Sequence, residues 1–332
     1  MNVFPTQYSV LSATALNNYL SEAYDLDNTA CCLLIHNVSD TYLLENGDGK
    51  YIFKIYRDAH RKPDEIKGEI NLLLTLKGRG AKVSYPLADL TGKYFHPFNA
   101  AEGIRYGVLF TYAKGKVSVE LSETQLEELG KEMAVLHNIT SDTPLVYNRI
   151  RFDIDTTITL PLQVIKPAFA ELRDEYDYLI TTAAKVTAKL QETNYSNFSY
   201  GYCQYDFLPK NFHFDDDDNI TFFDFDFAGE GYLMNDIMSF YIHYFLEVTY
   251  GKMSRSDAEA AFGVFLNSYR KVRQLHEDEL KAMCYLGFGF WIFYLGFQYE
   301  NFDDWSNIFF GPKFLKDRVA LIKKWIDWFG EL

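Results

Sequence analysis

The sequence is short of cysteine and of positive charge. Four cysteines occur among 332 residues, with no CxxC spacing and no readable disulfide framework, which predicts a reducing, cytoplasmic compartment. Lys and Arg number 32 against 46 Asp and Glu, which gives a net charge of −14. Because binding to nucleic acid needs a basic surface, we expect no nucleic-acid partner, whereas a cationic substrate is compatible with this charge.

Hydrophobic runs that suit a leader or a membrane span are also scarce. The first ten residues have neither a basic flank nor a long apolar core, so no signal peptide is predicted. Residues 282–299 carry no charge, which reaches the lower length limit for a span. They are rich in Gly and Tyr, however, and have no basic loop beside them. We therefore expect a buried helix here and no membrane association.

The length predicts two lobes, since one hydrophobic core rarely serves so long a chain. Helical spacing begins at Ser9, and a second helical pattern, 62–80, has Pro63 near its start and glycines at its end. Strand-like runs occupy residues 31–37, 41–46, 50–57, 85–98 and 104–113. Gly47-Asp48-Gly49 favours a hairpin turn over a phosphate-binding loop. The first lobe is therefore predicted as residues 1–112, a small β-rich lobe with one inserted helix.

The texture changes after the first lobe, where helical patterns dominate. Ser122 followed by Gln125 is a capping box before an amphipathic run. The main interruption is residues 212–225, a hairpin whose acidic run 215–218 we interpret as a solvated turn rather than a calcium loop. The fold class predicted is α+β, with a larger and mostly helical second lobe, residues 113–332.

Three polar side chains flank this hairpin. Asp206 precedes it on a loop, Asn211 follows five residues later, and Asp224 lies at the far end of the hairpin. Because a hairpin returns the chain to its start, the three can converge on one point. Phosphoryl transfer needs such a set: one carboxylate to orient or deprotonate a hydroxyl, and an amide oxygen and a second carboxylate as hard ligands for Mg²⁺. We predict Asp206 as the catalytic residue and Asn211 and Asp224 as metal ligands.

Two charged residues of the first lobe suit the same chemistry. Lys54, on the third strand-like run, can neutralise the phosphates of a nucleotide, and Glu69, on the helix predicted at 62–80, can hold that lysine by an ion pair. Taken singly they would be an edge-strand lysine and a surface charge. Together with the three polar residues of the second lobe they favour a nucleotide-binding role.

Several segments, in the same order, resemble the aminoglycoside phosphotransferase family, the protein-kinase-like group that includes choline and homoserine kinases. The family's His-Gly-Asp-x-x-x-x-Asn corresponds to QYDFLPKN, its Ile-Asp-Phe to FDFD, and its Asp before a helix to NDIMSF. Its lysine strand, glutamate helix, hinge and first large-lobe helix correspond to YIFKIYR, EIKGEINLLLTL, GVLFTYAKG and LGKEMAVLHN. The resemblance covers most of the chain and implies a bilobal, protein-kinase-like fold.

The resemblance also implies an activity, the ATP- and Mg²⁺-dependent transfer of the γ-phosphate to a hydroxyl of a small molecule. Asp206 is similar to the family's catalytic base, and Asn211 and Asp224 are similar to its Mg²⁺ ligands. By the same match Asp226 would assist the metal site, and Asp236 would hydrogen-bond the catalytic loop.

Nucleotide contacts are implied for the first lobe. The family's hinge presents backbone groups to adenine, which makes Phe110, Tyr112 and Ala113 expected cofactor-binding residues. The loop between the first two strands, HNVSDT, has no glycine. It would cover the phosphates through backbone N–H groups and the Ser39 hydroxyl.

Two alternatives stay open. Gln204-Tyr205 stands where the family has His-Gly; Gln can donate and accept hydrogen bonds, so we read it as tolerated, but it motivates a nucleotide-binding pseudokinase scaffold. Residues 265–283 resemble the homoserine-kinase and stress-kinase branch, which leaves open a protein Ser/Thr kinase of the bacterial stress-kinase type. Asp303 and Asp304 are candidates to meet a substrate cation. The sequence specifies neither the acceptor nor the oligomeric state.

Overall fold

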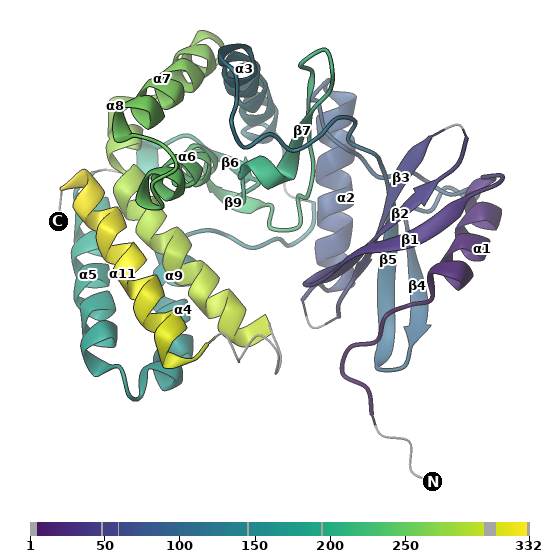
Figure 1. Cartoon of the computed structure of the whole chain (residues 1–332), viewed down its shortest axis with the longest axis horizontal. Coiled ribbons are helices and arrows are strands. Elements are labelled where there is room, and N and C mark those ends of the chain that lie inside the picture. The colour runs from purple at the N-terminus through teal and green to yellow at the C-terminus, as the bar shows by residue number, and fades with distance from the viewer. Residues whose placement is uncertain are drawn as a thin grey trace. The chain divides into compact units, whose positions relative to one another are not determined.

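The computed structural model describes residues 5–47, 49–58, 60–144, 146–193, 195–301 and 310–330. The chain divides into two compact units, drawn in Figure 1. The first unit holds the described residues up to Lys114, with 146–148 and Thr221–Phe223. The second unit holds Gly115–Pro144, Arg149–Ile220 and the described residues from Asp224 onward.

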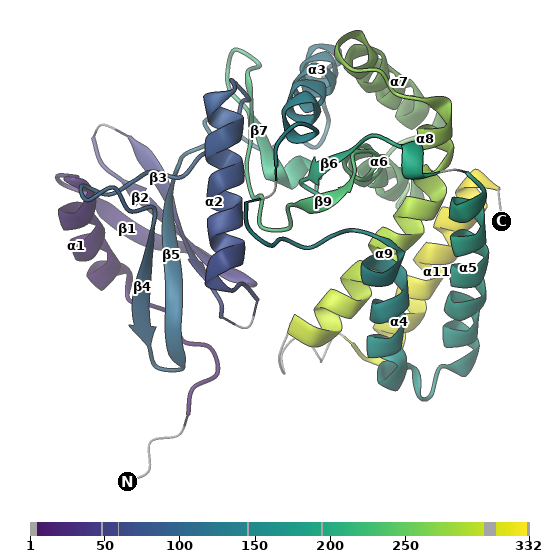
Figure 2. The ribbon, with the colours of Figure 1, turned by 180° about the vertical axis from the view of Figure 1, so that it is seen from behind.

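The first unit is a five-stranded antiparallel sheet with two helices. Its elements are α1 (Ala13–Tyr24), β1 (Ala30–His36), β2 (Ser39–Glu45), β3 (Lys50–Tyr56), α2 (Pro63–Gly78), β4 (Phe95–Ala100) and β5 (Gly103–Thr111). The strand order is β1-β2-β3-β5-β4, and α1 and α2 lie on opposite sides of the sheet in Figures 1 and 2. Phe53 and Ile55 of β3 join α1 in the core. Because side chains alternate along a strand, Lys54 points to the other face, the side of α2.

Local sequence signals explain both the agreement and one error in this unit. The β2–β3 hairpin is confirmed, closed by the Asn46 N–H, which donates to the Gly49 oxygen at 3.0 Å; Asp48 lies outside the described residues. The strand expected at 85–98 is confined to Phe95–Ala100. Its first half is wrong because the Asp89 carboxylate accepts the N–H groups of Thr91 and Lys93, each at 2.8 Å, and this turn ends any extended run.

The remaining elements are mostly helical, as predicted. They are α3 (Glu123–Thr140), η1 (Asp155–Thr159), α4 (Leu160–Ile165), η2 (Lys166–Phe169), α5 (Arg173–Glu192), η3 (Tyr195–Asn197), β6 (Tyr200–Cys203), η4 (Pro209–Asn211), β7 (Phe212–Phe214), β8 (Ile220–Phe222), β9 (Gly229–Tyr232), α6 (Met234–Thr249), α7 (Arg255–Val272), α8 (Glu277–Lys281), α9 (Met283–Asn301) and α11 (Pro312–Phe329). The Ser122–Gln125 capping box is present, with both reciprocal hydrogen bonds. β7 pairs with β8 around the acidic turn, whose Asp215 carboxylate accepts the Asn219 N–H at 2.9 Å. The pairing of β6 with β9 was not predicted from the sequence pattern.

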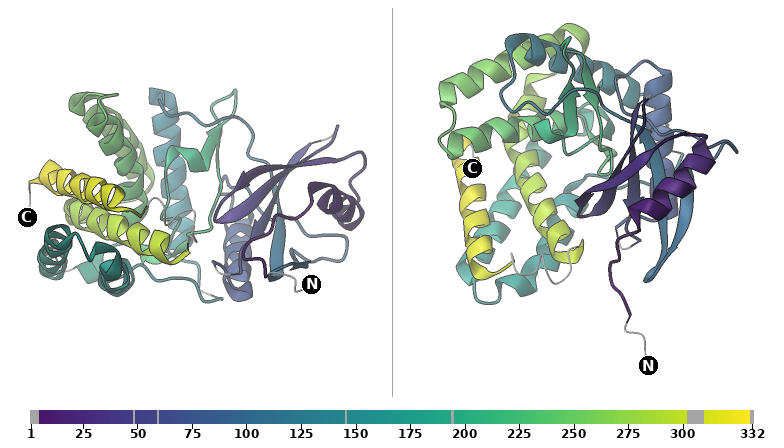
Figure 3. Two further views of the ribbon diagram at one scale, coloured as in Figure 1. Left: turned by 60° about the horizontal axis from the view of Figure 1, so that its bottom comes forward. Right: turned by 45° about the vertical axis from the view of Figure 1, so that its right-hand side comes forward.

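The charge-free segment forms α9, the central helix of the second unit. α4, α5, α6 and α11 pack around it, and Figure 3 shows the yellow α11 lying along the yellow-green α9. Gly287 permits the close approach of α11, since a Cβ there would overlap the Trp325 ring. The expectation of a buried helix is confirmed. In the described part of the chain, no helix is long and apolar enough to cross a membrane.

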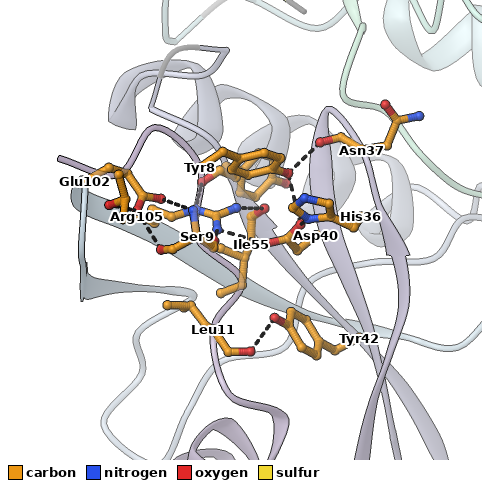
Figure 4. A network of polar contacts seen from close by, with 12 residues as sticks. Tyr8, Ser9, Leu11, His36, Asn37, Asp40, Tyr42, Ile55, Glu102 and Arg105 are labelled. Carbon is orange, nitrogen blue, oxygen red and sulfur yellow. Dashed lines mark hydrogen bonds and ion pairs between the residues drawn. The ribbon is translucent and has the colours of Figure 1, made fainter. Parts of the chain in front are cut away.

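A buried ion pair ties the strands of the first unit together. Arg105 of β5 and Asp40 of β2 are 2% and 0% exposed, and an Arg105 Nη1 to Asp40 Oδ2 contact of 2.8 Å joins them (Figure 4). The same guanidinium donates to the main-chain oxygens of Ser9, Ile55 and Tyr56. Burial of a charge is tolerated only when the group is paired and hydrogen-bonded, and here both conditions hold.

Removing one partner of this pair should strongly destabilise the protein. We expect Arg105→Met to lower the free energy of unfolding by about 3–5 kcal/mol, because the Asp40 carboxylate would stay buried without its cation. Urea unfolding followed by circular dichroism measures the change. Lys313→Met is the matched control, since it removes a cation from the exposed pair with Asp317 and should have little effect. Equal losses in the two variants would contradict the role of Arg105.

Candidate functional site

The loop from β6 to β7 brings two of the predicted residues into contact. Asp206 lies between β6 and η4, and Asn211 ends η4, where Pro209 at the first position suits a short helical turn. The Asn211 Nδ2 donates to the Asp206 main-chain oxygen at 2.7 Å and to its Oδ2 at 3.0 Å. Both side chains are buried, with 4% and 3% exposed. The loop therefore holds them as one fixed pair.

Asp236, in the first turn of α6, accepts hydrogen bonds from the backbone of this loop. Its Oδ1 accepts the Tyr205 N–H at 2.7 Å, and its Oδ2 accepts the Gln204 N–H at 3.0 Å. The carboxylate is fully buried, and His137 Nε2 lies 3.1 Å from its Oδ2. This is the hydrogen bonding that the family resemblance implied for Asp236. It fixes the two residues that immediately precede Asp206.

Two residues of the site region have an unusual backbone conformation. Tyr205 and Asp224 have φ values of 68° and 58°, in the left-handed region that residues other than glycine seldom adopt. The Tyr205 ring stacks on Phe152 with centroids 3.6 Å apart, and Phe293 packs against it edge-on. Such strain costs about 1–3 kcal/mol per residue and persists where the surroundings enforce it. Tyr205 immediately precedes the predicted catalytic residue Asp206, and Asp224 is itself a predicted metal ligand.

Asp224 lies close to Asp206, as the hairpin argument required. Gln204 Nε2 donates to the Asp224 main-chain oxygen at 3.3 Å, so the Gln that replaces the family's His spans the two segments. The Asp224 carboxylate is also near enough for its charge to raise the pKa of Asp206. The structure thus brings together Asp206, Asn211 and Asp224.

The electrostatics of Asp206 reflect its burial and its neighbours. Burial raises the pKa of its carboxyl group above the usual value, and the Asp224 charge acts in the same direction. Lys210 Nζ, 2.7 Å from Asp206 Oδ2, opposes both effects. Two carboxylates kept close together are a repulsive arrangement that a divalent cation would relieve.

The donor set fits a hard cation such as Mg²⁺. Because the Asn211 Nδ2 is directed at Asp206, its Oδ1 is the atom that can face a metal, beside the oxygens of Asp224. Mg²⁺ needs only one or two carboxylates, since it keeps several water ligands. No group of three or more His, Cys, Asp and Glu side chains in the described residues, this site included, could hold a metal, so the proposed ligands here are one carboxylate and one amide oxygen. Asp226, two residues after Asp224, is buried as well.

The nucleotide-binding residues predicted in the first unit have well-defined places. Lys54 in the middle of β3 and Glu69 in α2 are 8% and 2% exposed. Charged groups so deeply buried require partners, which agrees with the expected ion pair; the pair itself stays a prediction. Ser39 opens β2, directly after the turn that links it to β1.

The segment expected to meet adenine lies at the end of β5. Phe110 and Ala113 are buried and Tyr112 is half-buried. The Ser84 hydroxyl donates to the Thr111 oxygen at 2.6 Å, which holds this part of the backbone in place. Its role toward a nucleotide stays a prediction.

Comparison with known proteins decides the family. A model described as the phosphotransferase enzyme family matches residues 34–275, most of the chain. The chain belongs to the phosphotransferase enzyme family. The resemblance stated from the sequence is thereby confirmed, and so is the predicted enzyme class, a kinase.

Relatives of this phosphotransferase extend over nearly its whole length. An uncharacterized protein of Synechocystis is 30% identical over 309 residues, covering 92% of this chain and 84% of its own. The homoserine kinase of Paramagnetospirillum magneticum is 27% identical over 299 residues, covering 85% and 84%.

Solved structures confirm the α+β, kinase-like fold of the phosphotransferase. An amicoumacin kinase in complex with AMP-PNP and Ca²⁺ superposes with a TM-score of 0.70 at 18% identity, covering 93% of this chain and 94% of its own. A microcompartment-associated aminopropanol kinase gives a TM-score of 0.66 at 17% identity, covering 94% and 95%. At this identity the likeness is one of fold.

Two residues of the phosphotransferase's site were missed in the sequence analysis. Lys210 belongs to the same loop as Asp206, and its spacing of four residues could have suggested the ion pair. Tyr294 of α9 is distant in sequence; burial raises its pKa, and the charge of Asp206 adds to the effect. The Tyr294 hydroxyl lies close enough to the Asp206 carboxylate for a hydrogen bond between the two side chains to contribute to this shift. Asp303 and Asp304 lie outside the described residues.

Proposed function

We propose that this phosphotransferase moves the γ-phosphoryl group of ATP to a hydroxyl of a small molecule that carries an amino group. The observation that carries the proposal is the buried, hydrogen-bonded pair of Asp206 and Asn211, with the Asp224 charge close enough to act on Asp206. Phosphoryl transfer is catalysed mainly by positioning and by charge stabilisation, and these residues supply both.

In this proposal Asp206 orients the acceptor hydroxyl and takes its proton. The carboxylate suits that task because Asn211 and the backbone anchor at Asp236 restrict its motion. Lys210 is 61% exposed at its side chain, so it can move off the carboxylate when an acceptor binds. Before the acceptor binds, Lys210 compensates the charge of the Asp206 carboxylate. Once Lys210 has moved away, the carboxylate can take the proton of the acceptor hydroxyl.

Asn211 Oδ1 and the Asp224 carboxylate are the proposed metal ligands, and Asp226 supports them from two residues away. When bound, Mg²⁺ would neutralise negative charge on the nucleotide phosphates. The chain's own contribution is to hold two oxygen ligands rigidly, one through the Asn211–Asp206 hydrogen bond and one through the strained backbone of Asp224.

Residues of the first unit are proposed to bind the nucleotide. Lys54 would pair with its phosphates and Glu69 would hold the lysine in position. Ser39 and the β1–β2 turn would cover the phosphates, while Phe110, Tyr112 and Ala113 would meet the adenine through their backbone. Support comes from the burial of Lys54 and Glu69 and from AMP-PNP in the amicoumacin kinase of the same fold.

The acceptor is proposed to be an amino alcohol or a hydroxy amino acid. The names of a homoserine kinase and an aminopropanol kinase describe acceptors that combine a hydroxyl with an amine. The net charge of −14 favours the approach of such a cation. Cytoplasmic location is proposed as well, because none of the four cysteines, all of which the structure describes, forms a disulfide, as a reducing compartment would ensure.

An acceptor panel tests the proposed function. Mg²⁺-dependent release of ADP from ATP should be stimulated by one or more members of a panel of homoserine, aminopropanol, choline, ethanolamine, aminoglycosides and sugars. Asp206→Asn should lower that stimulated rate by about 10²–10⁴-fold while nucleotide binding persists, because only the proton acceptor is lost. An unchanged rate in this variant would refute the role of Asp206. A flat panel with ATP still bound would favour a protein acceptor or a scaffold.

The metal role of Asp224 has a separate readout. In Asp224→Ala the affinity for ADP should no longer depend on Mg²⁺, because one of the two proposed ligands is missing. Asp216→Ala is the matched control, since it removes the same charge from an exposed position of the acidic turn. Calorimetric titration of ADP with Mg²⁺ and with EDTA compares the two. Retention of the Mg²⁺ dependence in Asp224→Ala would contradict the assignment.

A further inference from the structure

The turn that joins β1 to β2 has no glycine, although the proposed function requires it to lie over phosphates. Asn37 and Val38 form the turn, and the Asn37 N–H donates to the Ser39 oxygen at 3.1 Å. Glycine would let such a turn adjust its backbone freely, whereas these residues have a narrower range of conformations. The turn therefore cannot adapt to phosphates as freely as a glycine-rich loop, so the conformation that it has before binding matters.

The segment 6–11, which we call the N-terminal strap, contacts the turn directly. The hydroxyl of Tyr8 lies 2.5 Å from the main-chain oxygen of Asn37 and 2.9 Å from Asp40 Oδ1 (Figure 4). Both oxygens are acceptors, so the single phenolic proton is shared between the turn and the first buried residue after it. One side chain of the strap thus holds both sides of the turn.

Two neighbours clamp the ring of Tyr8. The ring stacks on His36 with centroids 4.3 Å apart and planes 19° apart, and the guanidinium of Arg57 lies 3.2 Å from its centroid. His36 is itself fixed, because its Nδ1 lies 2.6 Å from Asp40 Oδ1. A stacked cation and a stacked ring leave Tyr8 little freedom to turn away.

The strap is fastened to the sheet beyond Tyr8 as well. The Ser9 oxygen accepts from Arg105 Nη1 at 2.7 Å, and the Ser9 hydroxyl donates to Glu102 Oε2 at 2.6 Å. Two residues further on, the Leu11 oxygen accepts from the Tyr42 hydroxyl at 2.7 Å. The Arg105–Asp40 pair therefore supports both the strap and the turn that the strap holds.

Peptide geometry gives this contact a direction. The carbonyl of Asn37 and the N–H of Val38 belong to one planar trans peptide, so they point to opposite sides. When Tyr8 holds the carbonyl toward the strap, the Val38 N–H must face away from the strap. Backbone N–H groups held in this way are suitable donors to phosphate oxygens. The Asn37 carbonyl, which would repel a phosphate, points toward the strap instead.

We infer that Tyr8 is a positioning residue for nucleotide binding: it fixes the β1–β2 turn so that the Val38 N–H is presented to the nucleotide phosphates. The inference rests on the proposed function. It explains how a turn without glycine can contact the phosphates. Before the nucleotide binds, the strap already fixes the conformation that a glycine-rich loop adopts only on binding. Because the turn is already ordered, nucleotide binding does not lose free energy to ordering it.

Tyr8→Phe tests the inference, with Tyr24→Phe as the matched control. Each variant loses one hydrogen-bonded tyrosine hydroxyl of the first unit, but the Tyr8 hydroxyl reaches the turn, whereas the Tyr24 hydroxyl lies 3.0 Å from His96 Nε2 of β4. We expect Tyr8→Phe to raise the Kd for Mg²⁺-ADP, and the KM for ATP, by about three- to tenfold, with kcat little changed, as suits the loss of one hydrogen bond. Tyr24→Phe should lower the Tm without changing either constant.

Hydrogen exchange in the absence of nucleotide gives a readout that does not depend on activity. The amides of residues 37–40 should exchange faster in Tyr8→Phe than in the unsubstituted protein and in Tyr24→Phe. Equal nucleotide affinity in the three proteins, or equal shifts in the two variants, would overturn the inference and leave the proposed function intact. If the unsubstituted protein bound no nucleotide, the proposed function would fail, and the inference with it.

Discussion

The candidate site depends on one buried carboxylate, that of Asp236. It accepts two successive N–H groups of the β6–β7 loop and is itself fully buried against His137. A carboxylate in that position is stable only while those donors stay in place, so the loop and the aspartate enforce each other. This arrangement requires a strained, left-handed backbone at Tyr205, and it fixes the orientation of Asp206.

A buried aspartate has the same role in the first unit. Asp40 is fully buried and receives Arg105, His36 and Tyr8, which come from β5, β1 and the segment before α1. In each unit a buried aspartate thus fixes an irregular stretch of backbone next to a residue proposed to act on ATP. Helices and strands supply the scaffold, whereas buried carboxylates set the loops that carry the chemistry.

The sequence predicted what depends on local signals. The Ser122–Gln125 capping box, the turn after β2 and the helix begun by Pro63 each lie within a few residues, and all three formed as expected. Asp206 and Asn211 also met because only five residues separate them. Contacts between distant segments had no such signal: Tyr294 reaches Asp206 from α9, and Arg105 reaches Asp40 across 65 positions. The four-residue strands β6 and β9 were missed because pairing alone, not a pattern of alternation, defines them.

The composition of α9 also bears on how the chain is synthesised. With no charge from Met283 to Tyr299, the helix has no side that is stable in water, so every face has to be covered. α4, α5 and α6 precede it and are made first, but Trp325, which packs on Gly287, belongs to α11 and is made later. Until α11 leaves the ribosome, that face of α9 stays exposed. The second unit therefore cannot complete its folding before α11 is made, and until then α9 exposes apolar surface of the kind that promotes aggregation.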